Sequence, residues 1–182
     1  MKKIFIIIFL FILTNNVYAS VKENIINKLE NIENISFKFE QNINSKIENG
    51  NCTIEYPKKI YCKYDQSNNK ILVSNGKSLV IKTISSYYIY SLKKTPLYLI
   101  LDKTFLIEKI QKLQGRKIED KLINFNFIEN ETQINIFFDQ KTFNLVGWQT
   151  VDIYQNISIT YLSSIKRNQK LKENLFLLPK QN

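Results

Sequence analysis

Long stretches of the chain alternate apolar and polar residues with a period of two, and this pattern constrains the fold more than any other feature. Successive side chains of a strand point to opposite faces, so each stretch forms a strand with one apolar face. The clearest example is the pair of segments 52–56 and 60–64, whose apolar sets are Cys52, Ile54, Tyr56 and Ile60, Cys62, Tyr64. The pattern predicts an antiparallel hairpin packed on a core.

Turn-forming residues divide the remaining alternation into further strands. Asn75-Gly76 separates segments 71–74 and 77–81, and Asn-Gly is a strong hairpin signal. Asn49-Gly50 is predicted to be a turn in the same way, after a strand at 36–43 that carries Phe37 and Phe39 on one face. Other strands are expected at 86–92, 122–128, 132–138, 145–151 and 157–165.

Three segments have the spacing of helices. Residues 21–35 are amphipathic and follow Ser20, a good capping residue. Thr95-Pro96 predicts a helix start with the threonine as cap and the proline at the first helical position. A third helix is expected at 104–113. The fold class is therefore α+β: a long antiparallel sheet with a leading helix and a short helical insertion, in one domain over residues 20–182.

The first nineteen residues are interpreted as a cleavable signal peptide. Lys2 and Lys3 precede an apolar run from Ile4 to Leu13, and Val17-Tyr18-Ala19 suits a peptidase site. An uncleaved membrane anchor is the alternative, although ten apolar residues are too few to span a bilayer. No cysteine follows the expected cut, so we expect the mature protein to be unlipidated and periplasmic.

Composition argues against an enzyme. The chain has no histidine, which removes the commonest general base and most zinc sites. Four of its five aspartates lie at predicted turns or strand ends, where polar caps and turns explain them: Asp65, Asp102, Asp139 and Asp152. We predict no catalytic residue, no metal site and no cofactor. Without Lys2 and Lys3 the net charge falls from +10 to +8, yet export makes nucleic acid an unexpected partner. Attraction to an anionic membrane stays open.

Cys52 and Cys62 share a face of the predicted hairpin. A register that pairs Ile54 with Ile60 sets the two cysteines directly opposite, within reach of a disulfide. An oxidising compartment favours the disulfide over two free thiols. Either state serves packing and stability, and the spacing matches no zinc knuckle.

The segment Leu97 to Leu101 has almost no polar face. A helix that is apolar all round must be buried on more than one side or must cover something apolar. It is either a core helix that plugs the sheet or a lid over a cavity for an apolar ligand. Face parity alone assigns the cavity wall, and the apolar segment itself supplies the lid residues. The wall candidates are Phe37, Phe39, Ile54, Tyr56, Ile60 and Tyr64; the lid candidates are Pro96, Leu97, Leu99, Ile100 and Leu101.

The order of these parts resembles the LolA-type periplasmic lipoprotein carriers. Residues 36–41 (SFKFEQ) resemble the family's first strand, Tyr56-Pro57 with residues 60–65 its hairpin, and residues 71–77 (ILVSNGK) its turn. Residues 95–101 (TPLYLIL) match the family's short helix. Residues 145–148 (LVGW) with Asp152 are similar to a strand of alphaproteobacterial members, and Phe176 with Pro179 to the family's ending. The resemblance covers nearly the whole mature chain.

The resemblance implies an incomplete, strongly curved half-barrel whose mouth is covered by helices. It also implies a carrier that holds lipoprotein acyl chains, receives them from an inner-membrane ABC transporter complex and passes them to an outer-membrane lipoprotein receptor. A monomer suits such a shuttle. The alternative is a periplasmic lipid-sensing or regulatory half-barrel, although such regulators carry a further domain.

One position departs from the family pattern. The basic residue before the hairpin proline, which helps hold the lid closed in characterised members, is Tyr56 here. A phenol supplies neither the charge nor the forked donors of a guanidinium, so lid control is expected to use other contacts. Surface lysines such as Lys58, Lys59, Lys93 and Lys94 are candidates for partner interfaces, with plain solvation as the simpler explanation.

Overall fold

A computed structural model describes residues 20–65, 68–151 and 156–181 of the chain. The predicted signal peptide at 1–19 and Asp152 lie outside these ranges. No helix within them is both long enough and apolar enough to cross a membrane.

The leading helix α2 (Val21–Glu30) is shorter than predicted. Ser20 caps it as expected: its hydroxyl accepts a hydrogen bond from the Glu23 amide, and the Glu23 carboxylate accepts one from the Ser20 amide. The prediction that the helix runs to residue 35 is wrong, because the first strand already begins at Asn34. Ile32 and Ile35 are still buried, so their apolar spacing reflects the core and not the helix.

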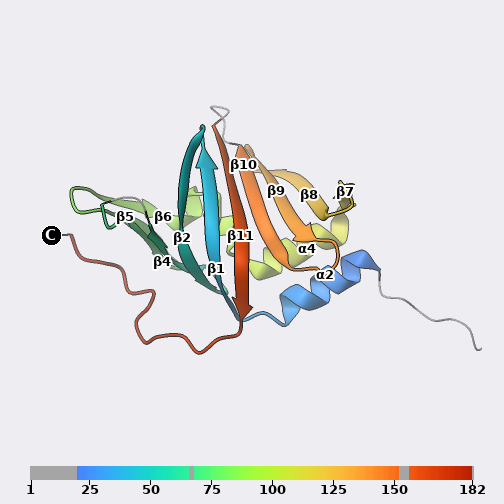
Figure 1. Cartoon of the computed structure of the whole chain (residues 1–182), viewed down its shortest axis with the longest axis horizontal. Helices are drawn as coiled ribbons and strands as arrows, with labels where there is room; N and C mark the ends of the chain where they lie inside the picture. The colour runs from blue at the N-terminus through green and yellow to red at the C-terminus, as the bar shows by residue number, and fades with distance from the viewer. Residues whose placement is uncertain (1–19, 66–67, 152–155, 182) are drawn as a thin grey trace, which may run out of the picture.

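One antiparallel sheet of eleven strands forms the body of the described chain (Figure 1). Its strand order is β6-β5-β4-β3-β2-β1-β11-β10-β9-β8-β7. The strands are β1 (Asn34–Ile43), β2 (Lys46–Glu55), β3 (Lys59–Tyr64), β4 (Ile71–Asn75), β5 (Ser78–Lys82), β6 (Tyr87–Ser91), β7 (Arg116–Ile118), β8 (Leu122–Glu129), β9 (Thr132–Asp139), β10 (Leu145–Val151) and β11 (Ile157–Arg167).

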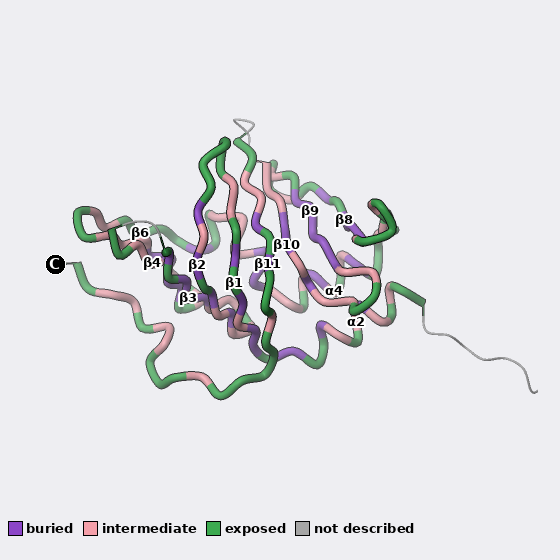
Figure 2. Tube along the Cα trace, in the orientation of Figure 1, coloured by how far each residue is buried: buried purple, intermediate pink, exposed green. Residues whose placement is uncertain are grey.

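The sheet curves but does not close, since β6 and β7 are its two edges and do not pair with each other. The helical insertion lies against the inner face and α2 lies across one end (Figure 1). The buried residues follow this arrangement, with alternate positions buried along the central strands (Figure 2). The predicted α+β half-barrel with a leading helix and a helical insertion is confirmed.

The β2–β3 hairpin has the predicted register. Ile54 pairs with Ile60, and Cys52 pairs with Cys62. The two cysteines form a disulfide, with their Cα atoms 4.1 Å apart. The Asn75-Gly76 turn between β4 and β5 is also found, and Gly76 adopts the positive φ of 95° that favours glycine there.

The predicted turn at Asn49-Gly50 is wrong, because both residues lie inside β2. The chain reverses instead at Asn44 and Ser45, which have φ of 47° and 70°. Gly50 is needed for close packing: a Cβ there would lie 2.8 Å from the Phe39 ring and would clash with the carbonyl oxygen of Lys63. A backbone carbonyl on one neighbouring strand and an aromatic ring on the other therefore explain this glycine.

The helical insertion starts with a 3-10 turn, η2 (Leu92–Lys94), followed by α3 (Leu97–Ile100) and α4 (Lys103–Lys112). The predicted capping of α3 is wrong by one residue. Pro96 occupies the cap position, and the Thr95 hydroxyl donates to the Leu92 carbonyl oxygen instead. Asp102 caps α4 by accepting a hydrogen bond from the Phe105 amide at 3.1 Å.

Candidate functional site

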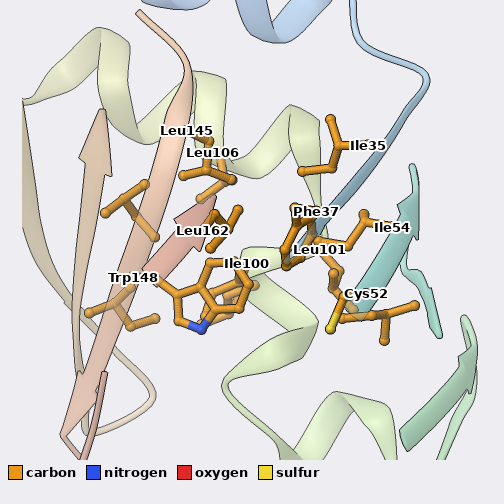
Figure 3. Packing of buried hydrophobic residues seen from close by; sticks show 14 of the residues in the cluster. Ile35, Phe37, Cys52, Ile54, Ile100, Leu101, Leu106, Leu145, Trp148 and Leu162 are labelled. Carbon is orange, nitrogen blue, oxygen red and sulfur yellow. The ribbon is translucent and has the colours of Figure 1, made fainter. Parts of the chain in front are cut away.

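The inner face of the sheet and the helical insertion share one apolar core. Figure 3 shows side chains from opposite parts of the sheet pointing toward the same space, with Ile100 and Leu101 between them. Phe37 and Trp148 meet edge to face there, with ring centroids 6.4 Å apart. Such an arrangement lets two aromatic rings pack closely without a polar partner.

The predicted wall residues all lie on this side of the sheet. Five of them are buried members of the core: Phe37, Phe39, Ile54, Ile60 and Tyr64. Tyr56 is half-buried and packs against the same core from just beyond the end of β2. Their shared face follows from the two-residue period of β1, β2 and β3, which alternates each strand between the core and solvent.

The candidate lid segment contacts this wall through its last residues. Leu99, Ile100 and Leu101 are buried in the same core, whereas Leu97 and Tyr98 are partly buried. Pro96 is half-buried at the start of the helix. Helix α3 thus inserts one end into the inner face and leaves the other end near the surface.

The space between α3 and the sheet is filled by side chains. Leu99 and Ile100 of α3, with Leu106 and Ile110 of α4, pack in one cluster with the buried residues of the sheet. An apolar ligand on the inner face would have to take the place of side chains that now fill it.

Lys58 connects the β2–β3 turn to the helical insertion. Its ammonium group lies 2.9 Å from the Asp102 carboxylate and donates to the Tyr98 hydroxyl at 3.1 Å. The same group lies 4.2 Å from the centroid of the Tyr98 ring, and the Lys58 amide donates to the Leu101 carbonyl oxygen at 2.8 Å. The contacts of this one residue reach Tyr98 within α3 and both Leu101 and Asp102 just beyond its C-terminal end.

The charge of Lys58 is held in place by these partners. The hydrogen bonds that the Lys58 ammonium donates to Asp102, and next to Tyr98, raise its pKa above the ordinary value. Its side chain is only 24% exposed. The interpretation of Lys58 as a solvated surface lysine is therefore wrong. Sequence reasoning missed it because its partners lie about forty residues away; the one local signal was a basic residue beside the hairpin proline.

Two tyrosines of the core, Tyr56 and Tyr64, have phenol groups whose pKa is raised. Burial raises the pKa of the Tyr56 phenol, and burial together with the Glu48 charge raises that of Tyr64. Both phenols are therefore neutral in ordinary conditions. Within the described ranges, no group of three histidine, cysteine, aspartate or glutamate residues could hold a metal ion. What this interior offers chemically is non-covalent contact with an apolar partner.

Sequence reasoning also left out much of the inner face. Strand β11 and the strands beyond it contribute a second set of buried residues, in which Phe125 contacts Phe138 with ring centroids 5.9 Å apart. The set comprises Ile123, Phe125, Phe127, Ile134, Ile136, Phe138, Trp148 and Leu162. Strands were expected at 122–128 and 132–138, and the alternation within them could have assigned six of these residues to the inner face.

Comparisons with known proteins agree with this architecture. A comparison with curated protein sequences finds no significant match. Among solved structures, a chain of the Pseudomonas aeruginosa MucA/MucB complex has a TM-score of 0.50 and 8% identity, over 88% of this chain and 61% of that one. This chain thus spans about three fifths of that protein, and the likeness is one of fold.

In two further solved structures, the match covers nearly the whole of the solved chain. A putative outer membrane lipoprotein-sorting protein domain from Vibrio parahaemolyticus has a TM-score of 0.49 and 10% identity, over 84% of this chain and 94% of that one. A LolA superfamily protein from Nitrosomonas europaea has a TM-score of 0.45 and 8% identity, over 86% and 97%. The family described as outer membrane lipoprotein carrier protein LolA matches residues 30–178, and the chain therefore belongs to the LolA family.

Proposed function

We propose that the chain is a periplasmic carrier that binds the acyl chains of lipoproteins and delivers them from the inner to the outer membrane. Membership of a family described as outer membrane lipoprotein carriers supports the proposal. The observation that carries it is α3, a short apolar helix that is inserted into the inner face and held there by its buried residues and by the contacts of Lys58. This helix would be the lid, and the inner face the acyl-chain site.

A filled interior suits a carrier that must also release its cargo. Burying each methylene of an acyl chain is worth about 0.8 kcal/mol, so an open apolar cavity would hold a long chain too tightly to pass it on. If the side chains of α3 refill the space when the lipid leaves, part of that free energy is recovered. The buried Leu99, Ile100 and Leu101 have the chemistry for that exchange.

The remaining parts of the proposal follow from this role. Residues 1–19 would be removed as a signal peptide, and residues 20–182 would form the mature, monomeric domain. The partners would be lipidated proteins, an inner-membrane ABC transporter complex and an outer-membrane lipoprotein receptor. The carrier itself would catalyse no reaction and need no cofactor, because transfer only moves acyl chains between apolar sites.

In this proposal, Lys58 holds the lid closed in place of the basic residue that the family has at the position of Tyr56. Its contacts with Asp102, Tyr98 and Leu101 would hold the lid closed. Ligand binds only the open form, so the apparent affinity is the intrinsic affinity multiplied by the open fraction. Weakening the closed form should therefore tighten binding.

The test is the substitution Lys58→Met, which keeps an unbranched side chain and removes the charge. The lost ion pair and hydrogen bond are worth about 1–2 kcal/mol, so we expect affinity for a synthetic triacylated lipopeptide to rise on the order of tenfold. Native mass spectrometry of the protein titrated with that lipopeptide measures the bound fraction directly.

Lys59→Met is the matched control. Lys59 lies next in the chain, and its ammonium contacts the half-exposed Glu55 carboxylate at 2.7 Å on the sheet. Affinity should stay unchanged in this variant. If Lys58→Met and the unmodified protein bind the lipopeptide with equal affinity, Lys58 does not control the lid. If the unmodified protein does not bind the lipopeptide at all, the carrier proposal is contradicted and the regulatory half-barrel is favoured.

A further inference from the structure

A groove of about 850 Å³ lies on the outer face of the sheet, turned away from the helices. Its floor is formed by β1, β2, β3 and β11, and its rim by the C-terminal segment 169–175. This segment continues toward the far end of the sheet (Figure 1), where the Lys180 carbonyl oxygen accepts a hydrogen bond from the Lys82 ammonium and that of Pro179 accepts one from the Tyr87 hydroxyl.

The groove is lined by five lysines and by no aspartate or glutamate. The lysines are Lys38, Lys63, Lys166, Lys170 and Lys172. All five are exposed, and none forms an ion pair with another residue in the described part of the chain. The acidic residues Glu40 and Asp65 line a separate cavity of about 450 Å³, which shares Lys38 with the groove.

Strand register brings three of these lysines together. Lys38 and Lys63 both pair with Asn51, one from each side, so they lie two strand spacings apart, about 10 Å. Lys166 pairs with Ser36 on the neighbouring strand. The sheet thus holds three positive charges in a fixed arrangement, and the C-terminal segment adds two more.

Strands β1, β2 and β3 each have a paired strand on both sides, so their backbone groups are already used. A polypeptide therefore cannot bind here by adding a strand, and recognition is left to the lysine side chains. Ammonium groups at this spacing suit a surface of phosphate groups. Apolar residues lie beside them: Leu171 and Leu175 line the groove, and Leu177 is 72% exposed.

We propose that this groove docks the protein on a bilayer surface rich in anionic phospholipid headgroups. The groove and the lid lie on opposite faces of the sheet. Docking here therefore leaves the inner face free, and it does not depend on the carrier role.

The test uses the full chain with vesicles of phosphatidylglycerol or phosphatidylcholine in a flotation assay. The groove variant is Lys38→Gln, Lys63→Gln and Lys166→Gln together. The control variant is Lys93→Gln, Lys117→Gln and Lys121→Gln, which removes the same charge from exposed lysines outside the groove. Far-UV circular dichroism checks folding, and a third variant with arginine at the three groove positions keeps the charge.

We expect the chain to bind phosphatidylglycerol vesicles more tightly than phosphatidylcholine vesicles, and to lose binding as salt is raised. Three lysines near such a surface should account for a loss on the order of 100-fold in the groove variant, with a far smaller loss in the control. The arginine variant should bind like the unmodified chain.

Equal losses in the groove and control variants would show an effect of net charge alone and overturn the proposal. If both variants bind the vesicles as well as the unmodified chain does, another part of the chain binds the bilayer, and the proposal is overturned as well. If polyglutamate binds through the groove lysines while vesicles do not bind, the partner is an acidic protein and the bilayer assignment is wrong.

Discussion

Glu48 is a carboxylate that the sheet buries, with its side chain 6% exposed. Burial by itself would raise its pKa, but the hydrogen bond and charge of Lys70, followed by the charge of Lys46, outweigh that effect and lower it. Lys70 lies 2.6 Å from one carboxylate oxygen and Lys46 lies 3.4 Å from the other. Lys70 also lies 4.0 Å from the centroid of the Tyr64 ring, so the ion pair adjoins the candidate wall.

The substitution Glu48→Gln should lower the free energy of unfolding at neutral pH by about 2–3 kcal/mol, because it leaves Lys70 without its counter-charge. The folded-state pKa of Glu48 lies below the ordinary 4.5. Its charge therefore stabilises the fold above that pH, and this contribution disappears as the pH falls through the folded-state value. Urea unfolding at neutral pH and in acid measures both effects.

Glu55→Gln serves as the control for that measurement. Glu55 and Lys59 form an ion pair at 2.7 Å, but their side chains are 35% and 44% exposed. Exposed pairs contribute about 0.2–1 kcal/mol, so this variant should change little at any pH. A Glu48→Gln loss that persists unchanged in acid would mean that packing and not charge is responsible.

Helix α3 has only four residues, which is too short to be stable without tertiary contacts. Its position therefore depends on the docking of Leu99 and Ile100 in the core and on the contacts of Lys58. An element of this kind can leave its site without unfolding the sheet, since no strand pairs with it. These are the properties that a lid requires.

Leu99→Asp tests whether α3 is a lid or a plug. Leu99 is 8% exposed, and a carboxylate at this position would lie against the acyl chains in a liganded protein. Burying an unpaired charge is costly both in the closed core and against acyl chains, so α3 would stay in water in either state and could not cover the ligand. We therefore expect lipopeptide binding to be lost while far-UV circular dichroism stays unchanged. Leu177→Asp, at a leucine that is 72% exposed, should leave binding intact.

The two other outcomes of that experiment have different meanings. If Leu99→Asp unfolds the protein, α3 is a structural plug of the core. If folding and binding both stay unchanged, the assignment of Leu99 to the lid is wrong.

The described part of the chain is a curved, open sheet with β6 and β7 as its two edges, and the helical insertion packs on its inner face. A ligand on that face must therefore displace part of the insertion while the sheet keeps its pairing. The amides of Leu99 and Leu101, which donate to Pro96 and Leu97, should lose their partners when this happens.

Hydrogen exchange followed by mass spectrometry should detect this displacement. On addition of the triacylated lipopeptide, we expect faster exchange in residues 92–102 and no change in β1 and β11, whose long pairing lies at the centre of the sheet. Slower exchange throughout the molecule would instead indicate a ligand that binds the closed form from outside.

Local patterns were sufficient for most of the sheet. The register of the β2–β3 hairpin, with Cys52 opposite Cys62, could be predicted because the two strands are adjacent and share one alternation. The cap at Ser20 is equally local, since donor and acceptor lie three residues apart. In the candidate site, the face parity of Phe37 and Ile54 came from the same two-residue period.

Contacts between distant segments decided the rest. Gly50 looks like a turn residue in the sequence, yet it lies within β2, where the backbone of Lys63 and the ring of Phe39 on the two neighbouring strands leave no space for a side chain. Lys58 looks like a surface lysine, yet folding brings it to Tyr98 and Asp102. Alternation and capping depend on neighbours within a few residues, whereas ring packing and ion pairing depend on which segments the fold brings side by side.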